Sequence, residues 1–224
     1  MILRQIQDLI GDIYDVSVTH DVYDFLVTNR EHLPLAVRAS GSDEELIVAE
    51  GHDAVGVSLY LDPALLERLR QSNPLVELNE SNVADYWTAL EGVSHFLYFA
   101  WNAGHDKTVT LLELELQAEI DKYVASYLLL KRQFPTRFPV ELLHVLFERT
   151  RIDPQLARGR ENLYRAASRH AEKFCRRLAH SLQESRSATP ASGMESGVLA
   201  ELRRFYRLTD ARKLAHIEGL STAG

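Results

Sequence analysis

The sequence predicts a mainly α-helical α+β protein, with a helical bundle-like core and a small β-hairpin or three-stranded meander in the N-terminal half. Three observations lead to this prediction. Apolar residues recur with a helical period along most of the chain, residues 82–102 are apolar on almost every side, and residues 45–61 alternate instead. The 224 residues are 46% hydrophobic and 25% charged, which is typical of a soluble globular protein.

The N-terminal segment is expected to form two helices and a strand. A helical period predicts the first helix at residues 2–16, and a second at residues 20–29 with Thr19 as its N-cap. Residues 35–39 are assigned to a third strand, because a lone hairpin is marginally stable in water. The apolar positions of the first helix are Ile2, Ile6, Leu9, Ile10 and Ile13.

The hairpin is predicted at residues 45–61. An apolar run precedes the turn candidate at residues 51–53, and apolar and small or polar residues alternate after it. Asp62 and Pro63 then suit the N-cap and the first position of a helix, which should stop before Pro74.

The central helix is expected at residues 82–102, capped by Asn79 or Ser81 and ending near Gly104. Aromatic residues project from more than one side of it, so the chain itself or a partner has to cover it. The next segment, residues 108–132, begins with an alternation typical of a strand. We favour one long helix, because its residues are good helix formers and share one apolar stripe.

The C-terminal part contains a short helix at residues 140–150, a basic helix at residues 158–183, a mobile linker at about 185–197 and a final helix pair. Residues 1–150 hold 11 Lys and Arg against 24 Asp and Glu, a net charge of −13. Residues 151–224 hold 14 against 8, a net charge of +6. We therefore divide the chain into an acidic helical core, 1–150, and a basic part, 151–224.

The charge division suggests that the two parts attract one another or that the basic part meets an anionic partner. Nucleic acid is the less favoured partner, since no recognised nucleic-acid-binding motif accompanies the basic helix. Its candidate phosphate contacts are Arg165, Arg169, Lys173, Arg176 and Arg177.

The expected location is the cytoplasm, with no membrane segment. No run approaches the roughly 20 apolar residues of a membrane-spanning helix. The N-terminus lacks the apolar region of a signal peptide. The single cysteine, Cys175, cannot form an internal disulfide, which agrees with a reducing compartment.

The candidate site lies on the two central helices. Glu91 and His95, at i and i+4, are candidates for acid–base catalysis, and together with Glu115 and Glu119 for binding a divalent metal. The sequence lacks the Glu-x-x-His repeat of di-iron bundles and the His-Glu-x-x-His of zinc proteases. The simpler alternatives are a buried Glu–His pair and, for Glu115, Glu119 and Lys122, a solvated ladder of charges.

The leading functional hypothesis is a protein-interaction or regulatory module that binds another protein or forms a homo-oligomer. The excess aromatic surface of residues 82–102 and the charge division motivate it. One alternative is a small metal-dependent or acid–base enzyme with its site around Glu91 and His95. A second is nucleic-acid binding through the basic helix.

Overall fold

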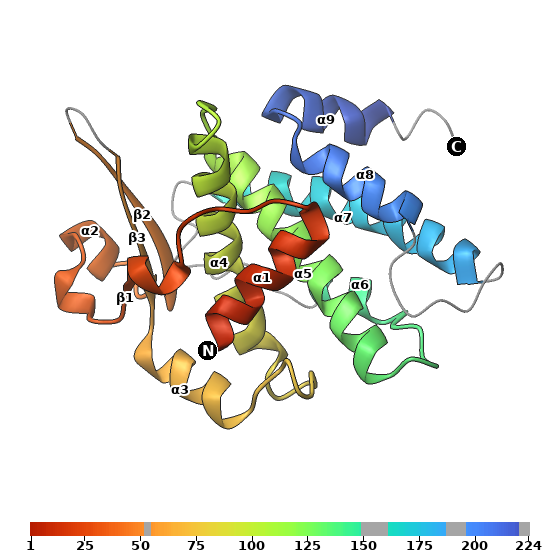
Figure 1. Cartoon of the computed structure of the whole chain (residues 1–224), viewed down its shortest axis with the longest axis horizontal. Helices are drawn as coiled ribbons and strands as arrows, with labels where there is room; N and C mark the ends of the chain where they lie inside the picture. Colours follow the sequence, from red (N-terminus) through yellow and green to blue (C-terminus); the bar gives the residue numbers. More distant parts are fainter. Residues whose placement is uncertain (52–54, 149–160, 187–195, 220–224) are drawn as a thin grey trace.

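The computed structural model describes residues 1–51, 55–148, 161–186 and 196–219, and Figure 1 shows a mainly helical fold with one small sheet. This architecture confirms the fold class predicted from the sequence. In chain order the elements are α1 (Ile2–Tyr14), η1 (Val22–Phe25), β1 (Leu26–Val27), η2 (Arg30–His32), α2 (Leu35–Arg38), β2 (Glu44–Glu50), β3 (Val55–Leu61), α3 (Pro63–Gln71), α4 (Val83–Ala103), α5 (Leu111–Gln133), α6 (Leu142–Phe147), α7 (Glu161–Arg186), α8 (Ser196–Tyr206) and α9 (Asp210–Gly219).

The two long helices α4 and α5 form the centre of the fold. They run antiparallel, because Trp87 of α4 bonds to Ser126 of α5 while Ser94, further along α4, bonds to Asp121, earlier in α5. In Figure 1, α1 crosses in front of this pair, the sheet lies beside α4, and α7 packs on α5. Buried residues of all these elements belong to one hydrophobic core.

The central helix α4 is covered by its own chain on several sides. Phe96 packs against Phe25, with ring centroids 5.0 Å apart. Tyr98 and Trp101 both contact Tyr206 of α8, at 5.0 and 5.5 Å. The aromatic surface of α4 is therefore largely used inside the protein. Among the helices of the described residues, none is both long and apolar enough to cross a membrane.

The predicted hairpin is present. β2 and β3 pair antiparallel with Leu46 opposite Leu59. Their connecting turn includes residues 52–54, which lie outside the described residues. A third strand completes a mixed sheet of order β1-β3-β2, because β1 pairs parallel with the free edge of β3.

Two predictions for the segment before the hairpin are wrong. Residues 35–39 contain no strand; they form the helical turn α2, in which the N–H groups of Val37 and Arg38 donate to the carbonyl of Pro34. Residues 20–29 contain only the 3-10 turn η1, capped by Asp21 in place of Thr19, before the chain enters the sheet as β1. Pairing with β3 overrides the local helical pattern there.

Helix starts follow the sequence signals in part. α3 begins at Pro63 with Asp62 accepting the N–H of Ala64, as predicted. α4 begins at Val83 with Asn82 as N-cap, so the predicted caps Asn79 and Ser81 are wrong; Asn79 instead accepts the N–H of Asn82 in a preceding turn.

The segment at residues 108–132, which begins with a strand-like alternation, contains one long helix, α5, as we favoured from the sequence. It starts at Leu111, because Thr110 and Glu113 form a reciprocal capping box. The predicted helix at residues 140–150 is the shorter α6.

The basic C-terminal part packs on the acidic core. Arg203 donates to the carbonyls of Asp12 and Ile13, and Arg207 donates to the carbonyl of Tyr14 at the end of α1. The last turn of α1 has no basic residue of its own, so these arginines complement its carbonyl end. Of the linker predicted at about 185–197, residues 187–195 lie outside the described residues. Residues 185–186 belong to α7, and residues 196–197 belong to α8.

The hairpin lies close to α4 because residue 92 is glycine. A Cβ at Gly92 would lie 2.8 Å from Cδ1 of Leu59 and 2.9 Å from Cγ of Glu44. Real side chains do not approach that closely, so any larger residue would push β2 and β3 away from the helix. Gly92 therefore sets the position of Glu44 relative to α4.

We predict that Gly92→Ala lowers the free energy of unfolding by about 1–3 kcal/mol, the usual cost of overpacking a core. Urea denaturation followed by circular dichroism measures this change. Gly197→Ala on α8 is the matched control, because nothing lies within 4 Å of the added Cβ, and it should not reduce stability. Equal midpoints for Gly92→Ala and the wild type would contradict the close packing.

Candidate metal centre

A cluster of ionisable side chains is enclosed between α4, α5 and β2. Glu91 and His95 lie one turn apart on α4, Glu115 projects from α5, and Glu44 is the first residue of β2. Only 5% of His95 is exposed, and Glu44 and Glu115 are buried as well. The three elements thus bring together acids and a histidine that are far apart in the sequence.

The imidazole of His95 lies between two carboxylates. Its Nδ1 is 3.4 Å from Oε1 of Glu44, and its Nε2 is 3.9 Å from Oε2 of Glu115. Both contacts have ion-pair distances, but Oε1 of Glu44 and Nε2 of His95 have no hydrogen-bond partner among the described residues. Burial alone lowers the pKa of His95, yet the charges of Glu115 and Glu44 outweigh it and raise this pKa to about 10.

Lys122 of α5 closes the opposite side of the cluster. Its Nζ lies 2.5 Å from Oε2 of Glu91 and 2.8 Å from Oε1 of Glu119. Lys122 is buried, whereas 27% of the Glu91 side chain and 20% of the Glu119 side chain are exposed. This edge of the cluster therefore reaches solvent. Burial alone would raise the pKa of Glu91, but the ammonium of Lys122 lowers it, so Glu91 is ionised.

Negative groups outnumber positive ones in this cluster. Burial raises the pKa of Glu115 to about 8 and also raises the pKa of Glu44, against the opposing attraction of His95. The excess has to be held by protons or by a cation, since buried charges need compensation. Among the described residues, the ion pairs of four carboxyl groups, those of Glu44, Glu91, Glu115 and Glu119, are with the ammonium of Lys122 and the imidazole of His95.

Three of these residues are arranged as the ligands of one ion would be. Glu44, Glu91 and His95 each offer one ligand atom, and these atoms lie within 4.8 Å of one another. Two ligands of one ion, each about 2.2 Å from it, can be at most about 4.4 Å apart, so a small inward movement suffices. Glu115 is positioned beside His95 as a further ligand or as its hydrogen-bond partner.

The structure brings the four metal ligands predicted from the sequence into one cluster, with differences in detail. Glu91 bonds to Lys122, so its charge partner is this lysine. Glu119 is also held by Lys122, at the edge of the cluster. Of the solvated ladder proposed as an alternative, the i,i+3 pair of Glu119 with Lys122 is present. Glu115 and Lys122 are buried, so they are not part of a solvated face.

A second polar network lies next to the cluster in the same helix pair. Asp121 is buried and accepts three hydrogen bonds, from Tyr14 at 2.5 Å, Ser94 at 2.5 Å and Gln117 at 2.8 Å. Burial raises the pKa of Asp121 to about 6 although these bonds favour its charged form. The network joins α1, α4 and α5 through one carboxylate.

Lys213 of α9 extends this network to the C-terminal helices. Its side chain is fully buried, and its Nζ donates to Oε1 of Gln117 at 2.7 Å. The ammonium lies 4.4 Å from the ring centre of Tyr98 and 4.9 Å from that of Phe205. Burial lowers the pKa of Lys213 to about 7, against the attraction of surrounding acids. These acids are Glu113, Asp121 and Asp210.

The basic residues predicted on residues 158–183 form an exposed row on α7. Arg165 pairs with Glu161 within the helix, and Arg176 pairs with Glu172 and with Glu148 of α6. Arg165 and Arg176 are thus partly neutralised by the chain itself. Nucleic-acid contact through this row stays a prediction.

Two other sequence interpretations have clear outcomes. The i,i+4 spacing of His144 and Glu148 predicts a surface contact, and the two form an exposed pair at 2.7 Å. In the sequence Cys175 stands among Lys173, Arg176 and Arg177, whose charges would favour a thiolate. The structure contradicts this, because Cys175 is fully buried and burial raises the pKa of its thiol well above the usual range.

Several residues of the two networks escaped the sequence analysis. Glu44 opens a strand, where an acid usually faces solvent, and nothing in the local pattern indicates that α4 covers it. The sequence did contain a signal for the burial of Gln117 and Asp121, since two polar residues at i and i+4 interrupt an otherwise apolar segment of α5. It contained no signal for the burial of Lys213, because that burial depends on how α9 packs on the core.

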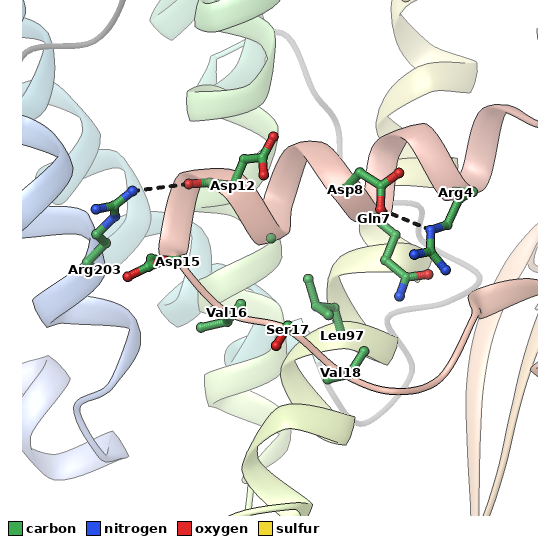
Figure 2. A pocket seen from close by; sticks show the side chains of 11 residues that line it. Arg4, Gln7, Asp8, Asp12, Asp15, Val16, Ser17, Val18, Leu97 and Arg203 are labelled. Carbon is green, nitrogen blue, oxygen red and sulfur yellow. Dashed lines mark hydrogen bonds and ion pairs between the residues drawn. The ribbon is translucent and has the colours of Figure 1, made fainter.

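A surface pocket lies beside α1 and is separate from the metal cluster. Its volume is about 660 Å³, and Figure 2 shows that α1, the segment after it and Arg203 of α8 surround it. Arg4 bonds to Asp8 along α1, and Arg203 of α8 bonds to the carbonyl of Asp12. None of the clustered acids or His95 lines it, so it is a separate surface feature.

Comparisons with known proteins assign no family to this arrangement. No protein-family model, curated protein or solved structure matches the chain. We therefore infer function from the residues and distances of the cluster alone.

We predict that replacing Lys213 changes the pH dependence of stability. Between about pH 7 and its ordinary pKa of 10.5, the unfolded chain binds a proton at Lys213 that the folded chain does not. Raising the pH through this range should therefore stabilise the wild type relative to Lys213→Met, by at most about 1.4 kcal/mol per pH unit.

Urea denaturation at a series of pH values measures this difference. Lys173→Met, which removes an exposed lysine of α7, is the matched control and should follow the wild type at every pH. Parallel profiles for the wild type and Lys213→Met would show that the folded protein keeps Lys213 charged.

Proposed function

We propose that this protein binds one divalent metal ion between β2 and α4, with Glu44, Glu91 and His95 as ligands. The observation that carries the proposal is the convergence of their three ligand atoms within 4.8 Å in a buried cluster. Oε1 of Glu44 and Nε2 of His95 lack hydrogen-bond partners among the described residues. Buried polar atoms are nearly always satisfied, and a metal ion beside Glu44 would satisfy its Oε1.

The charge of the cluster favours the same occupant. A divalent cation would offset the carboxylates that Lys122 leaves uncompensated, and it would let Glu115 ionise beside His95. The ligands would bind in their deprotonated forms, with His95 neutral. Metal binding is therefore expected to stabilise the fold, since the unfolded chain lacks this arrangement.

The ligand types indicate which metals fit. Carboxylate oxygens with one imidazole suit a first-row divalent ion such as Mn²⁺, Fe²⁺ or Zn²⁺. A closed structural zinc site commonly uses cysteine, and Cys175 of α7 is not among the clustered groups. Lys122 has the role of a positioning residue, because its ammonium holds the carboxylate of Glu91.

The cluster is partly exposed at one edge, so a metal ion bound there would be able to act in catalysis as well as to stabilise the fold. At Glu91 and Glu119 a bound ion would be accessible to water, and a divalent metal lowers the pKa of a bound water towards neutrality. Glu119, which is held by Lys122 at the same edge, would be the candidate general base of the site. We therefore favour the metal-dependent enzyme among the sequence hypotheses, acting in the cytoplasm.

The interaction hypothesis stays a prediction, but its original motivation is weaker. Phe96 and Tyr98 of the central helix are covered by the chain itself. The basic part of the chain contacts the acidic part through Arg203 and Arg207. Neither feature therefore requires an outside partner.

The metal test uses protein stripped with a chelator and then given Mn²⁺, Fe²⁺ (without oxygen), Zn²⁺ or Mg²⁺. We expect at least one of the first three ions to raise the melting temperature and to bind near one equivalent by elemental mass spectrometry after desalting. A stabilisation of about 2.7 kcal/mol corresponds to an ion concentration 100 times its dissociation constant.

Glu44→Gln and His95→Gln should each lower metal affinity by about tenfold or more while the protein stays folded. The matched controls are His144→Gln and Glu148→Gln, which alter an exposed pair of the same type, and they should bind metal as the wild type does. Absence of stabilisation by every ion, or equal losses in the controls, would refute the site.

A further inference from the structure

An apolar groove lies on the surface at the end of the central helix pair, away from the metal cluster. Its volume is about 320 Å³, and it lies between the first turns of α4, the end of α5 and α6. This volume is at the lower end of the range of ligand pockets, roughly 300–1,000 Å³. The apolar side chains that form its floor are Val83, Trp87, Leu130, Leu142 and Val145.

The walls of the groove are held in place before any ligand binds. The side chain of Gln133 accepts the N–H of Leu78 and donates to the carbonyl of Pro74, which ties the preceding loop to α5. The amide of Asn82 donates to the carbonyl of Glu77 on the same loop. A binding surface already in place avoids part of the ordering cost of association.

Three exposed apolar residues lie in or near the segments that line the groove. Val76, Phe134 and Val140 are 75%, 43% and 61% exposed, and each lies in or next to a segment that lines the groove. Exposed apolar residues beside an apolar groove are typical of a binding site for another molecule. Their spread over three segments favours a ligand longer than a single side chain.

The rim of the groove is acidic. Glu77, Glu80 and Glu141 line it with one arginine, Arg137, whose charge is already paired with Glu141 at 3.0 Å. The two remaining acids are part of a segment, residues 1–150, with a net charge of −13. The electrostatic complement of this rim is therefore a cationic ligand.

We propose that the groove binds an amphipathic basic helix of another protein. Large apolar side chains of that helix, spaced at i and i+3 or i+4, would fill the floor, while its lysines and arginines face the acidic rim. Within the described part of the chain, a second copy does not supply such a helix. Its own basic helix, α7, already buries its apolar face, including Phe174 and Leu178.

This proposal is independent of the metal site, because none of the clustered residues lines the groove. The test therefore needs no metal. The probe is a fluorescein-labelled peptide of leucine and lysine, about 18 residues or five helical turns long, with its leucines on one helical face. Fluorescence anisotropy measures its affinity for the full chain.

We expect the peptide to bind the wild type, and Phe134→Glu to weaken binding by about tenfold or more, as for loss of an anchor contact. The double variant Glu77→Lys, Glu80→Lys should weaken binding several-fold and reduce its dependence on salt. The controls, Leu35→Glu and the double variant Asp24→Lys, Glu31→Lys, alter exposed residues elsewhere and should leave the affinity unchanged.

Four results would overturn the proposal. They are no binding at about 100 μM protein, equal binding of a leucine–glutamate peptide, equal weakening by Leu35→Glu, or an unchanged affinity in Phe134→Glu. A wild-type dimer in light scattering that Phe134→Glu dissociates would also overturn it, because a second copy would then occupy the groove.

Discussion

The antiparallel packing of α4 on α5, with charged groups enclosed between them, is the constraint on which this structure depends. Burying an ionised group is costly unless it is paired, so each acid of the pair needs a partner supplied by a neighbouring element. Lys122 serves Glu91 and Glu119, while Tyr14 and Ser94 serve Asp121. The positions of α1 and α9 follow from the same requirement, since Tyr14 and Lys213 complete the network.

The two polar networks satisfy their buried polar and charged groups to different degrees. All the side-chain oxygens of Asp121 accept hydrogen bonds from the protein. Around His95 the contacts are longer, and two buried atoms are left without partners among the described residues. A complete network holds the helices together, whereas an incomplete one at a partly exposed edge is typical of a functional site.

The sequence predicted the fold class, the hairpin and the long helices, because these follow from apolar period and helix caps. It also identified Glu91, His95, Glu115 and Glu119, since ionisable residues stand out in apolar helices. It failed where tertiary packing decides the outcome. Residues 26–27 pair with the free edge of β3 as strand β1 and do not continue a helix. Glu44 joins the cluster because Gly92 lets the hairpin pack close to α4. No local pattern encodes either contact.

The most direct test of the metal centre is an X-ray structure of the protein crystallised with Mn²⁺, using the anomalous signal of the ion. We expect one strong anomalous peak between β2 and α4, with Glu44, Glu91 and His95 each about 2.0–2.3 Å from it. Density without such a peak, with His95 still between Glu44 and Glu115, would contradict the proposal. The cluster would then be a buried ion network that only stabilises the α4–α5 pair.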